Sequence, residues 1–200
     1  MNLPYVIHGD RIITQSNACF SYLGRQLNLW GSTEDEVVEC EELLGEVMDI
    51  RNNMTKFAYG SDCNTETAAG CLRSMGGSLK KLELWLERRV AAGGSGTFLV
   101  SDNATAPDFH LYEMLVQVCA LAAHAALPSP LAASPRLAAF LQGFRALPGN
   151  ARFLASNIGS EAPLGLPFNN KMACFGADNE SLGRWVPGQE YSFRSFQGLY

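Results

Sequence analysis

One stretch of the chain repeats apolar side chains at alternating steps of three and four residues. On an α-helix this spacing places the side chains on one stripe, which must pack against a neighbouring helix. The segment is predicted to be helical from about Thr67 to Ala92 and to end at Gly93-Gly94. The pattern therefore predicts a fold built mainly by packing helix on helix. The residues of the stripe are Leu72, Met75, Leu79, Leu82 and Leu86.

Further helices are predicted on both sides of this segment. Thr33 and Glu36 form a capping box that begins a helix running to about Tyr59. Thr105 is a favourable N-cap, and Asp108 can reach back to its backbone N–H as a structural cap worth about 1 kcal/mol. The helix that follows is apolar almost all round, which is typical of a central, buried helix. Shorter helices are expected from 134 and over 150–156.

The first 27 residues have a different pattern. Tyr5–Ile7 and Ile12–Thr14 are short β-type runs on either side of a Gly9-Asp10 turn. Ser16 is predicted to cap a helix that continues to about Leu27. Because two strands are not stable alone in water, they need either partner strands or shelter against the helices.

Composition excludes several classes of protein. A net charge of −5 argues against a nucleic-acid partner. No apolar run approaches the ~20 residues of a membrane helix, and no secretory signal is recognisable, so a cytoplasmic protein is expected. The six cysteines form no Cys-x-x-Cys pair, so reduced thiols and no metal site are expected. No role is predicted for His8, His110 or His124.

Several short motifs, in order, resemble the cytosolic glutathione S-transferases. Asn2-Leu3-Pro4-Tyr5, then Gly9, then Thr14-Gln15-Ser16-Asn17-Ala18 resemble the Mu class. The likeness continues through 33–36, 48–49, Tyr59 and the 105–108 cap, and covers roughly residues 1 to 176. Two stretches, 22–25 and 153–156, look more like the Pi class.

The resemblance implies a mainly α fold. A truncated, thioredoxin-like β-β-α remnant carrying part of the glutathione site (1–27) would precede an all-helical C-terminal domain (33–165). An irregular tail (166–200) would follow.

Half of a glutathione site is implied by these motifs. A cis bond before Pro4 would turn the Leu3 backbone towards the cysteinyl part of glutathione, with Asn2 near the peptide. The helix start at Gln15 and Ser16 would bind the γ-glutamyl carboxylate. The plainer alternatives are that Pro4 is an ordinary turn proline and that Ser16 is only a helix cap.

Two further residues are implied on the second helix. Asp49 would cross a homodimer interface to meet the ammonium group of glutathione in the partner's site, and Tyr59 would face the electrophile. A solvated acid and an aromatic side chain packed at a helix end are the respective alternatives.

The chain as written departs from the family in one respect. The family's first strand, first helix and second strand, with the tyrosine that stabilises the glutathione thiolate, have no counterpart before Asn2, so no catalytic residue is identified. A fragment, a genuine short protein and an alternative activating group remain open, and the fragment is favoured. The expected function is conjugation of glutathione, a cosubstrate, to apolar electrophiles without a cofactor. A non-enzymatic ligand-binding or scaffold protein is the alternative.

Overall fold

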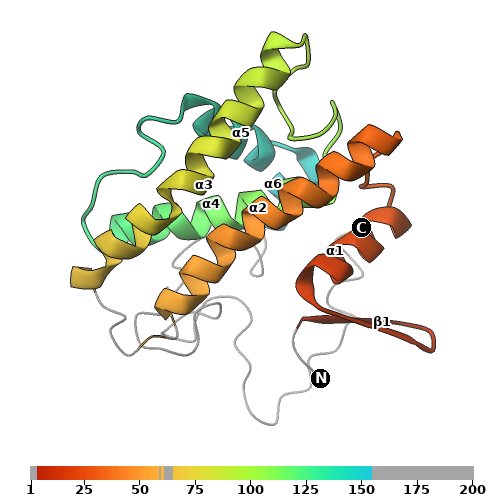
Figure 1. Ribbon diagram of the computed structural model, residues 1–200, viewed down its shortest axis with the longest axis horizontal. Coiled ribbons are helices and arrows are strands. Elements are labelled where there is room, and N and C mark those ends of the chain that lie inside the picture. The colour runs from red at the N-terminus through yellow and green to blue at the C-terminus, as the bar shows by residue number, and fades with distance from the viewer. Residues whose placement is uncertain (1–3, 59, 61–64, 155–200) are drawn as a thin grey trace.

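The computed structural model describes residues 4–58, 60 and 65–154 (Figure 1). These residues form one two-stranded sheet and six helices. The described part is therefore mainly helical, as the apolar spacing predicts. The sheet and the first helix lie at one side of the remaining helices in Figure 1. The predicted tail, 166–200, falls outside the described residues.

The sheet is an antiparallel hairpin of β1 (Tyr5–His8) and β2 (Arg11–Thr14). Its strands pair in a register that sets Tyr5 opposite Thr14 and His8 opposite Arg11. Gly9 turns the chain between them with φ of +58°, a conformation that favours glycine. The short strands are thus joined as the Gly-Asp signal predicts.

Helix α1 (Ser16–Gln26) covers one face of the hairpin. His8 and Arg11 share that face, and both contact the Tyr22 ring, the imidazole through a hydrogen bond of 2.6 Å between Nδ1 and Oη. The hairpin is therefore sheltered by its own helix on this face. On the other face Tyr5, Ile7 and Ile12 remain exposed. Residues 4–26 are called the hairpin–α1 unit below.

The expectation that Ser16 caps α1 is wrong. The N-cap is Gln15, because its carbonyl already accepts the first helical hydrogen bond, from the Cys19 N–H at 2.9 Å. Ser16 is the first residue of the helix itself. Its hydroxyl therefore stands in the first turn rather than before it.

Helices α2 (Glu34–Ala58) and α3 (Thr65–Ala91) are the long elements of the bundle. The predicted capping box of α2 is confirmed: Thr33 Oγ1 accepts the Glu36 N–H at 3.2 Å, and Glu36 Oε2 accepts the Thr33 N–H at 3.2 Å. Four of the five side chains of the α3 stripe are buried, and Leu72 is half-buried. The 3-4 spacing thus marks the face on which α3 packs.

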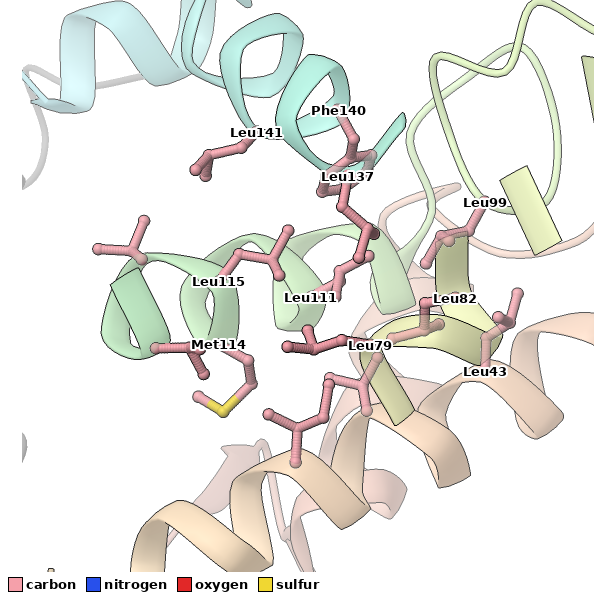
Figure 2. Packing of buried hydrophobic residues seen from close by; sticks show 14 of the residues in the cluster. Leu43, Leu79, Leu82, Leu99, Leu111, Met114, Leu115, Leu137, Phe140 and Leu141 are labelled. Carbon is pink, nitrogen blue, oxygen red and sulfur yellow. The ribbon is translucent and has the colours of Figure 1, made fainter. Parts of the chain in front are cut away.

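Helix α4 (Ala106–His124) lies at the centre, as its all-round apolar sequence predicts. Leu111 and Leu115 on this helix are completely buried. Helix α5 (Pro135–Arg145) packs on α4, and α6 (Pro148–Leu154) packs on α5. Figure 2 shows Leu137 and Leu141 of α5 above the leucines of α4, with Leu79 of α3 below them.

Within the described residues no helix is long and apolar enough to cross a membrane.

Candidate functional site

The turn between β2 and α1 has the properties of an anion site. The backbone of Gln15 has φ 74° and ψ 127°, a conformation that residues other than glycine rarely adopt. No side chain caps the start of α1, and its first turn carries no acidic residue. The N–H groups of this first turn, together with the helix dipole, therefore favour a negatively charged ligand.

The two strand ends that flank this turn are held by one thiol. Cys19 is buried, and its Sγ lies 3.5 Å from the Ile13 carbonyl oxygen and 3.8 Å from that of Pro4. Since Tyr5 pairs with Thr14, Pro4 lies level with Gln15 at the same end of the hairpin. Pro4 and Gln15 are exposed, and Ser16 is half-buried. The structure therefore brings these three predicted site residues together.

The other predicted ligand-binding residues are not part of this cluster or fall outside the described residues. Asp49 lies on α2 and is exposed, and its backbone carbonyl accepts a hydrogen bond from Asn53 Nδ2 at 2.9 Å. Among the described residues no hydrogen bond or ion pair joins the Asp49 carboxylate to the turn at Gln15. Asn2, Leu3 and Tyr59 fall outside the described residues.

The start of α4 is fixed by a buried carboxylate. Asp108 Oδ2 accepts both the Thr105 N–H and the Thr105 hydroxyl at 2.7 Å, and Oδ1 accepts the Leu99 N–H at 2.8 Å. Burial raises the pKa of Asp108 to about 6, although these hydrogen bonds favour the charged form. The N–H of Ala106 also donates to the Leu29 carbonyl at 2.8 Å. This helix start therefore anchors the linker that follows α1.

A second buried carboxylate acts between helices. Glu83 of α3 is 6% exposed, and its two oxygens accept the N–H groups of Arg136 and Leu137, each at 2.8 Å. Ser134 is the N-cap of α5 but makes no side-chain cap bond. The cap of α5 comes from a residue more than fifty positions earlier, so no local sequence signal could have identified it.

Two histidines to which the sequence assigned no role have partners. His8 accepts or donates the hydrogen bond with Tyr22 described above. His110 of α4 is buried, and its ring stacks on Phe20 of α1. Both contacts join residues on separate elements, and neither spacing along the chain nor composition predicts them.

The described part of the bundle also carries open grooves. One of about 430 Å³ lies between α2 and α3, where Leu43, Leu82 and Trp85 are flanked by the Lys81–Glu46 ion pair of 3.0 Å. A smaller one of about 330 Å³ is lined by residues that include Asn53, Lys56 and Ser74. In the part of the chain that the structure covers, no group of His, Cys, Asp and Glu side chains could hold a metal ion.

Comparisons with known proteins agree on one family. Residues 48–157 match the family model described as glutathione S-transferase, C-terminal domain. Human glutathione S-transferase Mu 3 is 32% identical over 175 residues, which are 88% of this chain and 70% of that protein. The class-mu 26 kDa isozyme of Schistosoma japonicum is 33% identical over 156 residues, 78% of this chain and 66% of that protein.

Solved structures show the same fold. The glutathione S-transferase Blo t 8 superposes with a TM-score of 0.70 at 23% identity, over 85% of this chain and 75% of that one. The Pi-class glutathione S-transferase of Onchocerca volvulus superposes with a TM-score of 0.62 at 26% identity, over 76% and 68%.

Proposed function

The chain belongs to the glutathione S-transferase family, and on that premise we propose that it binds glutathione at the turn between β2 and α1 and conjugates it to apolar electrophiles. The observation that carries the proposal is the start of α1, which no side chain caps and which directly follows the strained backbone of Gln15. Strain of this kind persists where the surrounding structure enforces it, and it is concentrated at ligand-binding sites.

At this turn we assign the γ-glutamyl carboxylate of glutathione. The free N–H groups of the first turn, the Ser16 hydroxyl and the Gln15 amide would each donate to it. Charge-assisted hydrogen bonds of this type are about twice as strong as neutral ones. Pro4 lies level with this turn, and we propose that the preceding Leu3 backbone pairs with the cysteinyl part of glutathione, close to Asn2.

The remaining roles complete the proposed site. Asp49, exposed on α2, would bind the glutathione ammonium group across a homodimer. Tyr59 would face the electrophile and stabilise charge that develops on it. The reaction is attack of the glutathione sulfur on an electrophilic carbon, with loss of a leaving group or saturation of a double bond. No described residue is assigned to stabilise the thiolate, and the division at 27 and 33 between two domains remains part of the proposal.

Membership of this family also supports proposals about the location, the oligomeric state and the biological role of the protein. We propose a cytoplasmic homodimer that takes part in detoxification and needs no metal cofactor. The acidic net charge of −5 is consistent with a small-molecule substrate rather than a nucleic acid.

Calorimetric titration of the full chain with glutathione tests the binding step. Ser16→Ala removes a hydrogen bond to a charged group, so the dissociation constant should rise about 10-fold or more. Ser21→Ala is the matched control, because Ser21 lies on the same helix beyond its first turn and its hydroxyl accepts a hydrogen bond from Arg25. Equal affinity of the two variants, or no binding by the native chain, would contradict the proposed site.

Turnover with a chlorinated nitroaromatic tests the chemical step separately. Formation of the thioether, seen by its absorbance, supports the transferase activity. Binding of glutathione without turnover would instead favour the non-enzymatic ligand-binding alternative.

A further inference from the structure

One buried histidine lies in the contact between the hairpin–α1 unit and the bundle. His110 stands in the second turn of α4, and its side chain is only 3% exposed. Its ring stacks on Phe20 of α1 with the centroids 4.6 Å apart and the planes inclined by 18°. The imidazole is therefore part of the surface that attaches α1 to the central helix.

The surroundings of this ring do not suit a positive charge. Nδ1 of His110 is buried and has no hydrogen-bond partner among the described residues. A proton added there would enter a site without an acceptor, which is costly in a protein interior. Phe20 contributes no charge, and the charged group that acts on the ring is Arg51 of α2, which repels a second cation. Burial, assisted by Arg51, lowers the pKa of His110 to about 4.

The other contacts of the unit with the bundle are less sensitive to pH. In the linker directly after the unit, the Leu29 carbonyl accepts the Ala106 N–H, and neither group titrates. Arg25 and Glu41 form an ion pair of 3.5 Å between α1 and α2, but both side chains are more than half exposed, so the pair contributes little. The Cys19 thiol faces the hairpin.

The second titratable group near the start of α4 responds to acid in the opposite sense. Asp108 is bound by Thr105 and Leu99, and burial raises its pKa. Acid therefore neutralises a charge that burial disfavours, and this does not weaken the bundle.

We propose that His110 makes the attachment of the hairpin–α1 unit sensitive to acid: protonation of its ring separates α1 from α4 while the helical bundle stays folded. The attached state excludes the proton and the separated state accepts it, so acid shifts the equilibrium towards separation. The inference does not depend on whether the unit binds glutathione.

The size of the effect follows from the two pKa values. In the separated state His110 is exposed and titrates near 6.5, whereas in the attached state its pKa is about 4. The equilibrium constant for separation should then rise by about 20-fold between pH 7 and pH 5.

Amide hydrogen exchange on the full chain tests the proposal, with rates corrected for the intrinsic effect of pH. Protection of α1 (Ser16–Gln26) should fall by about 20-fold from pH 7 to pH 5, and that of α3 (Thr65–Ala91) should stay constant. His110→Phe keeps an aromatic ring on Phe20 but cannot be protonated, so its α1 protection should be independent of pH. His8→Asn is the control for the histidine that contacts α1 from the hairpin: loss of its bond to Tyr22 should lower the protection of α1 at both pH values, but the change of about 20-fold between them should persist.

Three results would overturn the proposal: constant protection of α1, parallel loss in α1 and α3, or a native pH profile in His110→Phe. The imidazole resonances of the native protein give a second test that needs no variant. A midpoint for His110 near pH 4 supports the proposal, and one near 6.5 contradicts it.

Discussion

Removal of the Glu83 carboxylate should destabilise the bundle more than removal of any exposed acid on the same helix. Both of its oxygens accept N–H groups at the start of α5, and Leu137, whose N–H is one of them, is completely buried. Glu83→Ala leaves the buried Leu137 N–H and the partly buried Arg136 N–H unpaired, at a cost of about 1–3 kcal/mol for a fully buried donor, and removes a negative charge from a helix start. Because part of this cost is relieved by water, we expect a loss of about 2–4 kcal/mol in the free energy of unfolding.

Urea denaturation followed by circular dichroism measures this loss. With a slope of about 2 kcal/mol per molar urea, a loss of 3 kcal/mol lowers the midpoint by about 1.5 M. Glu87→Ala is the matched control, because Glu87 lies one turn later on α3 and is exposed. It should change stability by less than about 0.5 kcal/mol. If the two variants have the same midpoint, the carboxylate of Glu83 does not cap α5 in solution.

Two further predictions concern the start of α4 and its contact with α1. Burial raises the pKa of Asp108 to about 6 from 3.8, so the stability it contributes is fully present below pH 3.8 and is lost as pH rises through 6. As pH falls from 7 to 5, the free energy of unfolding of the native chain, measured in urea, should rise by about 1.3 kcal/mol relative to that of Asp108→Asn. A constant difference between the two proteins would refute this. Gly24→Ala should lower the melting temperature, because its Cβ would lie 2.7 Å from the Trp30 ring. In Gly45→Ala the added Cβ meets no atom within 4 Å, so the melting temperature should rise, with a gain in the free energy of unfolding of up to about 1 kcal/mol. A higher melting temperature for Gly24→Ala than for Gly45→Ala would show that α1 and the linker are not in close contact.

The sequence predicted the elements of the bundle well because their signals are local. The capping boxes at 33 and 105 and the 3-4 spacing of α3 each involve residues within a few turns of one another. The observed helices begin and end within a few residues of those expected, for example Glu34–Ala58 where 33–59 was predicted. Helices are encoded by neighbours along the chain, so a single sequence is enough to place them.

The site was predictable only through its motif. The order Thr-Gln-Ser places residues at a strand-to-helix turn, but the positive φ of Gln15 has no signal in the sequence, because glutamine rarely adopts it. The helix start was misplaced by one residue for the same reason. Glu83 and His110 are buried, and their partners come from helices far away along the chain, so only the packed structure brings them together.

Asp108 and His110 lie two residues apart on α4. Asp108 binds the segment before α4, His110 contacts α1, and acid changes the stability of these two connections in opposite directions. From pH 7 to pH 5, protonation of the carboxylate raises the free energy of unfolding of the bundle by about 1.3 kcal/mol. Protonation of the imidazole lowers the free energy of separating α1 from α4 by about 1.8 kcal/mol. A measurement of global unfolding alone would see these effects partly cancel and report little dependence on pH. The attachment of the hairpin–α1 unit must therefore be followed by a probe on that unit. If the proposed glutathione turn at Gln15 depends on this attachment, its affinity should decline in mild acid before the bundle unfolds.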